Sequence, residues 1–286
     1  MRRFSAALAA CAAAAAMAAE GDARWYVQVD NDVFFSDRWY SSGARLARVE
    51  ERAGHEIEVA MLQEIFTPEA KRFGPGVVDR APTARLLLSV ARHDRMPGVF
   101  QTLEIALGVR GPAALGRQTT DFIHRLVPAP QIDWSRQDSN RFDGQVAMVR
   151  THRLDWIDLH YGALIGNQVS FAHTGAEVRF GSRDTANTPV FRYAPTPPAI
   201  PGVSAGWGAF IGASVRGVAR NAMLKRQYSA SGGALDRRDA VTRVGGGVAW
   251  VGKYLAVGAA LVQESREFAG QREPHRFGSL TLHADF

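Results

Sequence analysis

Residues 102–110 read TLEIALGVR, and their side chains alternate strictly between two kinds. Four large apolar residues fall on one side of an extended chain, namely Leu103, Ile105, Leu107 and Val109. The other side carries charged residues together with small ones. A period of two indicates a β-strand with one apolar and one polar face. The stretch is also as long as the tilted strands that cross a bilayer, which need about 9–11 residues.

The same alternation recurs along the whole chain and predicts twelve strands. Several are longer than the strands of soluble sheets, which average about 5–6 residues, and an even number is usual for bacterial barrels. The final residue, Phe286, resembles the aromatic ending of outer-membrane barrels. We therefore predict an all-β fold, a transmembrane antiparallel β-barrel of about twelve strands. They are expected at 24–30, 42–50, 55–64, 84–92, 100–110, 143–152, 156–166, 171–181, 207–220, 241–252, 254–264 and 276–286.

Composition narrows the class of protein. Of the 286 residues, 46% are hydrophobic and 22% are charged, which excludes a disordered chain. The longest apolar run is too short for a membrane-spanning helix. The single cysteine, Cys11, excludes an internal disulfide and a cysteine-based zinc site. The net charge of +6 is spread without a basic cluster, so we expect no nucleic-acid partner.

The N-terminus predicts export. Two arginines follow the first methionine, an alanine-rich run covers 6–19, and residues 16–18 read AMA. A basic start, a short apolar run and small residues at the cleavage point are the parts of a secretory signal peptide. We predict a signal peptide over 1–18 and one barrel domain over 19–286.

Two segments do not fit strands. Residues 112–127 have a helical period, with Pro112 near the start and Pro128 after the end. This predicts a short helix in an extracellular loop. One of its faces would hold Leu115, Thr119, Phe122, Ile123 and Leu126, and the opposite face Arg117, Thr120 and His124. Five prolines within 187–202 predict a surface loop.

Few residues have an obvious chemical function. Residues 30–32 read DND at the end of the first predicted strand, and Ser41 follows closely in an SSG turn. Such oxygen-rich residues suit a hard cation such as Ca²⁺, although a polar turn would have the same composition. His124 could be a general base or a solvated surface histidine. The chain has no G-x-S-x-G elbow, H-E-x-x-H or phosphate-binding loop.

Several motifs together resemble one family. Residues 30–43, DNDVFFSDRWYSSG, resemble the opening motif of the outer-membrane lipid A deacylases, the LpxR family. That motif reads roughly N-D-x-F and then D-x-x-Y-T-x-G. Residues 63–68, QEIFTP, resemble Q-x-x-Y-T-P, and residues 107–116, LGVRGPAALG, resemble L-G-x-x-G-P-x-S-L-G. Residues 118–124 resemble the helix that carries the family's histidine, and 266–280 resemble its C-terminal hairpin.

The resemblance implies a twelve-stranded outer-membrane barrel and a Ca²⁺-dependent esterase that removes the 3′-O-linked acyl group of lipid A. In that family a histidine activates water, calcium stabilises the oxyanion, and the site lies between the barrel wall and a loop helix. Here His124 matches the base. Asn31 and Asp32 match the N-D pair, with Asp32 as first choice for calcium and Asn31 beside it, and Ser41 matches the hydroxyl residue.

The chain also departs from the family pattern. Residues 79–85 read DRAPTAR where the family has D-R-P-Y-A-G-W. Thr120 stands where a glutamine is expected four residues before the histidine, and Gln118 is a possible substitute. The nearest candidate for a family lysine is Lys71.

The expected partners follow from this interpretation. They are the outer membrane and a lipopolysaccharide substrate, lipid A. We expect a monomer, because a closed barrel leaves no strand edge to cover. Two alternatives remain: a barrel without enzymatic activity, such as a pore or structural protein, and a secreted soluble β-sandwich that binds glycans.

Overall fold

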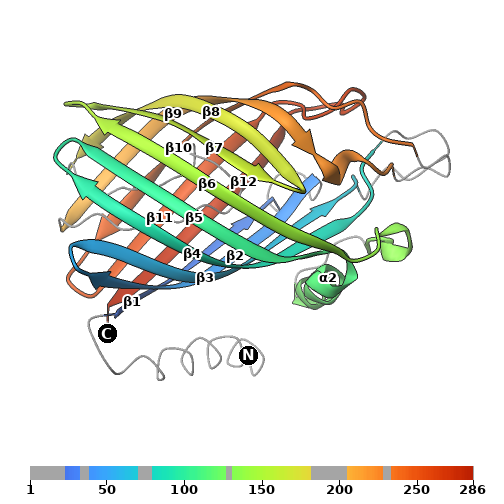
Figure 1. Cartoon of the computed structure of the whole chain (residues 1–286), viewed down its shortest axis with the longest axis horizontal. Coiled ribbons are helices and arrows are strands. Elements are labelled where there is room, and N and C mark those ends of the chain that lie inside the picture. Colours follow the sequence, from blue (N-terminus) through green and yellow to red (C-terminus); the bar gives the residue numbers. More distant parts are fainter. Residues whose placement is uncertain are drawn as a thin grey trace.

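A computed structural model describes residues 23–32, 39–69, 79–126, 131–181, 205–227 and 233–285. Within them, twelve antiparallel strands close into a barrel in which each strand pairs with its sequence neighbours and β1 pairs with β12 (Figure 1). The predicted fold class is confirmed, and the soluble sandwich is wrong because a sandwich is not a closed sheet. The predicted signal peptide, the proline-rich loop 187–202, Lys71 and Phe286 lie outside the described residues.

All twelve predicted strands are present, most of them longer than expected. They are β1 (Ala23–Asn31), β2 (Trp39–Arg52), β3 (His55–Thr67), β4 (Thr83–Met96), β5 (Val99–Arg110), β6 (Arg141–Arg153), β7 (Ile157–Gly166), β8 (Val169–Gly181), β9 (Gly206–Asn221), β10 (Ala240–Val251), β11 (Leu255–Glu264) and β12 (His275–Asp285).

The outer surface of the barrel is apolar. On β5, Leu103, Ile105 and Leu107 are 45%, 51% and 53% exposed, whereas Glu104 and Ala106 between them are buried in the lumen. This alternation, apolar outward and polar inward, is what a strand facing lipid requires. Among the described helices, none combines the length and the apolar character that crossing a bilayer demands.

The two ends of the barrel differ. Four of the five connections at one end are short turns, which join β2 to β3, β4 to β5, β6 to β7 and β10 to β11, and the fifth, between β8 and β9, covers residues 182–205. The β3–β4, β5–β6 and β9–β10 connections at the other end are long, and α2 (Gly116–Leu126) belongs to one of them. Outer-membrane barrels have short periplasmic turns and longer extracellular loops, so the end with α2 is the extracellular one. β12 ends at the opposite end (Figure 1).

The helix is shorter than predicted. Residues 112–127 do not form one helix: a 3₁₀ turn, η1 (Pro112–Ala114), comes first, and α2 starts at Gly116. Leu115 separates them because its φ of 60° is left-handed. Two further 3₁₀ turns are η2 (Trp134–Arg136) and η3 (Ala222–Leu224).

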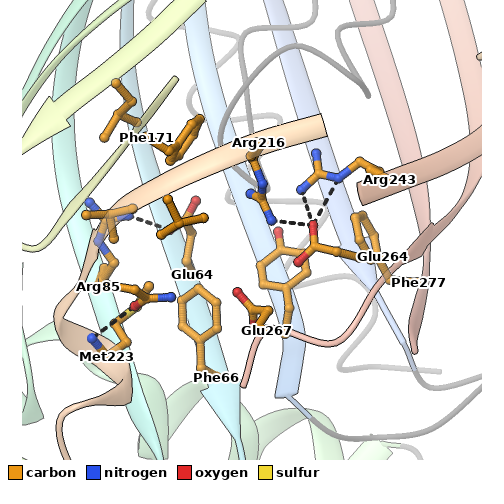
Figure 2. A pocket seen from close by; sticks show the side chains of 15 residues that line it. Glu64, Phe66, Arg85, Phe171, Arg216, Met223, Arg243, Glu264, Glu267 and Phe277 are labelled. Carbon is orange, nitrogen blue, oxygen red and sulfur yellow. Dashed lines mark hydrogen bonds and ion pairs between the residues drawn. The ribbon is translucent and has the colours of Figure 1, made fainter. Parts of the chain in front are cut away.

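The lumen is filled by ion pairs. Arg45 binds Glu58 and also Glu104, whose Oε1 lies 2.6 Å away. Nearer the extracellular end, one group joins Arg85 to Glu64 and Asp143, and another joins Arg216 and Arg243 to Glu264. Figure 2 shows Arg85 and Glu64 of the first group and Arg216, Arg243 and Glu264 of the second, which line a cavity of about 40 Å³ together with Phe66, Phe171 and Phe277.

Candidate functional site

The first hairpin brings three predicted site residues together. β1 ends at Asn31, which lies opposite Ser42 on β2 and Gly278 on β12. The backbone N–H of Asp32 donates to the carbonyl oxygen of Ser41 over 3.3 Å. Asn31, Asp32 and Ser41, three of the predicted site residues, therefore share one part of the extracellular rim.

A β-bulge on β2 sets the direction of the side chains there. The register between β2 and β3 shifts between Tyr40 and Ser42, so Ser41 is an extra residue. Tyr40 remains in the lumen and donates from its hydroxyl to Asp30 Oδ2 at 2.8 Å. The Ser41 hydroxyl instead forms a hydrogen bond with the hydroxyl of Thr67. Bulges often redirect a side chain in this way near functional sites.

Thr67 places this hydrogen bond on the outer wall of the barrel. On β3, Gln63 and Ile65 face outward: Gln63 Nε2 donates to the Ala114 carbonyl at 2.7 Å, and Ile65 packs with Trp134. Thr67 is the next residue in this alternating series. It is 0% exposed, and Ser41 is 7% exposed. The hydroxyls of Ser41 and Thr67 therefore form a buried polar pair on the outer face of the barrel wall.

An apolar cluster holds the β5–β6 segment against the same wall. Its members are Ile65, Ala84, Ala114, Ile132 and Trp134, all buried, and Leu86 and Val109 pack against it. The cluster lies outside the lumen, at the extracellular ends of β3 and β4. It fixes α2 next to the rim, and Figure 1 shows α2 outside the barrel.

The helix turns its polar side to the wall. Gly116, Thr120 and His124 are four residues apart and share one face. A Cβ on Gly116 would lie 2.5 Å from the Cβ of Ala84, so this face contacts β4 closely. Thr120 is buried and donates to the Gly116 carbonyl at 2.8 Å. Nδ1 of His124 is buried and has no hydrogen-bond partner within the described residues.

Part of the predicted apolar face points away from the protein, whereas Thr119 and Ile123 on that face are half-buried. Leu115 and Phe122 are 47% and 42% exposed. Gln118 is exposed too, and residues two apart on a helix do not share a face with one another. The structure thus brings Thr120 and His124 to the same side of α2 and places Gln118 elsewhere.

Sequence reasoning assigned no function to Asp79, which fixes the entry to β2. Its carboxylate accepts hydrogen bonds from Trp39 Nε1 at 3.2 Å and from the backbone N–H of Glu69 at 2.8 Å. Burial raises the pKa of the Asp79 carboxyl, and these donors partly oppose the shift. Trp39 has a left-handed φ of 62°, which is rare for a bulky residue. Asp79 therefore holds a strained segment directly before the Ser41 bulge.

The donor atoms at the rim are oxygens. Asn31 offers an amide, Asp32 a carboxylate that is 1% exposed, and Ser41 a hydroxyl. Over the described residues, no group of three or more His, Cys, Asp or Glu side chains is arranged to hold a metal. One carboxylate with neutral oxygens fits a hard cation such as Ca²⁺, provided that water or substrate completes the coordination.

A closed barrel with an apolar exterior, a packed lumen and a polar rim beneath an outer helix defines an outer-membrane β-barrel protein. The chain belongs to the family described as outer membrane protein LpxR, which matches residues 4–286. Comparison with curated proteins gives no match.

One solved structure supports the fold. LpxR from Salmonella typhimurium is similar with a TM-score of 0.78 and 18% identity, over 92% of this chain and 100% of that one. Two other barrels are less similar. The translocator domain of the autotransporter NalP from Neisseria meningitidis has a TM-score of 0.48 and 9% identity, over 99% of this chain and 98% of its own. The toluene transporter TodX from P. putida has a TM-score of 0.44 and 10% identity, over 94% and 91%.

Proposed function

We propose that this outer-membrane protein is a Ca²⁺-dependent esterase that hydrolyses the 3′-O-linked acyl chain of lipid A. The observation that carries the proposal is Nδ1 of His124 on the wall-facing side of α2, which is buried and has no hydrogen-bond partner among the residues that the structure describes. A buried polar nitrogen without a partner is costly unless water or a ligand completes it. Membership of the LpxR family supplies the substrate class.

In the proposed reaction, His124 accepts a proton from water while the water oxygen attacks the ester carbonyl. His124 then returns the proton to the leaving sugar oxygen, which gives a free fatty acid and a 3′-hydroxyl group. Asn31 and Asp32 would hold calcium beside the carbonyl. When bound, calcium would act as a Lewis acid that stabilises the developing oxyanion.

The location of α2 suits a lipid substrate. Leu88 on β4 is exposed to the bilayer, and Leu86, two residues closer to the rim, packs against the cluster that fixes α2. The helix thus lies directly above the lipid-facing wall, with Leu115 and Phe122 exposed. Acyl chains could stay in the leaflet while the ester reaches His124.

The test is mass spectrometry of lipid A from a Gram-negative host that expresses the chain. The wild type should remove the mass of the 3′ acyl or acyloxyacyl group in the presence of Ca²⁺, and His124→Ala should lose this activity by at least 10²-fold, as expected for a general base. His152→Ala is the control, because this histidine lies at the periplasmic end, stacked on Tyr161. Unchanged lipid A with folded wild-type protein would refute the proposal.

The alternative of a pore without enzymatic activity has less support. A pore needs an open lumen, whereas the largest side chains buried in this lumen include Arg45 and Arg85, which are ion-paired, and His93, which is hydrogen-bonded to Glu58. A hollow of about 830 Å³ at the periplasmic mouth includes Phe100, whose ring stacks on His93. His93 in turn bonds Glu58, the partner of Arg45, so this layer closes the hollow from above.

A further inference from the structure

The hydrogen bond between Ser41 and Thr67 has a direction that matters. Each hydroxyl has one hydrogen to donate and two lone pairs to accept with. If Ser41 is to give a lone pair to a cation, its own hydrogen must point elsewhere. Thr67 can take this hydrogen: it is fully buried at the end of β3, and its hydroxyl forms a hydrogen bond with the hydroxyl of Ser41.

From this geometry, and resting on the function proposed above, we propose that Thr67 is a positioning residue: it accepts the Ser41 hydrogen and so presents the Ser41 oxygen as a ligand for calcium at the outer wall. The bulge supplies the other half of the arrangement. Without the bulge, an unbroken ladder would pair Ser41 with Phe66 and Tyr40 with Thr67, and Ser41 would not meet the outer face of β3.

The covering segment explains why this pairing is stable. Thr67 follows Ile65 on the outer face of β3, and Ile65 is buried beneath Ala114 and Trp134. A folded protein is destabilised when a buried hydroxyl loses its hydrogen-bond partner. The two hydroxyls are therefore held together in the absence of any ligand, and the site is prepared before calcium or substrate arrives.

The test uses two substitutions of Thr67 in the full-length protein, folded in detergent. Thr67→Val keeps the shape and removes the hydroxyl, whereas Thr67→Ser keeps the hydroxyl. Calcium binding is measured directly, by displacement of luminescent Tb³⁺. Loss of a group that orients a metal ligand typically weakens metal binding about 10–100-fold, so Thr67→Val should raise the half-saturating calcium concentration by about tenfold or more. Thr67→Ser should stay within about twofold of wild type, and Ser41→Ala should match Thr67→Val.

A control separates positioning from folding. Thr151 is another strand threonine that is 1% exposed, but it lies at the far end of β6. Thr151→Val should leave calcium binding unchanged, and heat-modifiable migration on gels should show a folded barrel for every variant. In lipid A assays, extra calcium should restore the kcat of Thr67→Val.

The outcomes distinguish the two proposals. Wild-type calcium affinity in Thr67→Val, or a calcium affinity in Ser41→Ala equal to wild type, overturns the positioning by Thr67. If calcium binding changes as expected but wild type leaves lipid A intact, the positioning stands and the proposed hydrolysis fails. If wild type binds no calcium, both are overturned.

Discussion

Asp32 shows what a single carboxylate can and cannot do. It is the carboxylate of the rim that lies next to neutral oxygens from Asn31 and Ser41. Calcium affinity falls with fewer charged ligands, and sites in extracellular modules bind at about 10⁻⁴–10⁻³ M. This rim should bind calcium in the same weak range.

Removing the charge of Asp32 should weaken the site further. Asp32→Asn should raise the calcium concentration needed for half-maximal deacylation by at least about tenfold, since a carboxylate is the strongest hard-cation ligand present. Titration of activity with calcium measures this. The matched control is Asp30→Asn, whose carboxylate faces the lumen and accepts from Tyr40 and Gln28. An equal effect from both variants would contradict the assignment.

At the scale of elements, α2 reverses the usual expectation for an amphipathic helix. The sequence predicted an apolar face on Leu115 and Phe122, and such a face ordinarily packs inward. In an outer-membrane protein the apolar solvent lies outside, so the helix packs through Gly116 and Thr120 and exposes Phe122. The period of the helix was predictable from the sequence, but the side that contacts the protein was not.

The close contact at Gly116 makes α2 sensitive to one methyl group. Gly116→Ala would place a Cβ 2.5 Å from Ala84 Cβ and 2.8 Å from Trp134. Overpacking of this kind costs about 1–3 kcal/mol and should shift α2 off the wall. We expect deacylation to fall about tenfold or more, since small misplacements of a catalytic group are costly. The barrel itself should stay folded, as judged by heat-modifiable migration.

A compensating change makes this test specific. Ala84→Gly removes the nearest atom, so the double variant Gly116→Ala/Ala84→Gly should recover part of the lost activity. Recovery requires that α2 and β4 touch at this point. Equal activity in the single variant and wild type would show that α2 does not position the base.

At the scale of the whole molecule, the barrel was predictable from the sequence. Apolar residues recur at every second position of a strand that has one face in contact with lipid, so the alternation identifies both the strand and that face. Strand ends were less accurate: β2 was expected over 42–50 and extends from Trp39 to Arg52. The rim residues Asn31 and Ser41 were predictable because a hairpin joins them. The role proposed for Thr67 could not be predicted from the sequence, because its contact with Ser41 depends on a one-residue bulge, and the hydrophobic pattern does not reveal such a bulge.

The buried ion pairs of the lumen should make the largest electrostatic contribution to the free energy of unfolding. Arg45→Met leaves Glu58 and Glu104 buried without their arginine. Breaking a buried ion pair in this way costs about 3–5 kcal/mol. Urea unfolding in lipid vesicles should show this loss. Arg52→Met is the control: Arg52 is 70% exposed in its pair with Glu50, and such surface pairs contribute about 0–1 kcal/mol. A small effect at Arg45 would mean that the lumen relaxes or hydrates.

The pairing of β1 with β12 has a consequence for the chain before it folds into the outer membrane. Asn31 lies opposite Gly278, so the rim is complete only when the last strand has joined the first. Contacts between residues so distant in sequence form late, because the long loop between them must first be closed. An unfinished or chaperone-bound chain therefore lacks an assembled rim. The proposed esterase would in this way be inactive during transit and gain its activity only on insertion into the outer membrane.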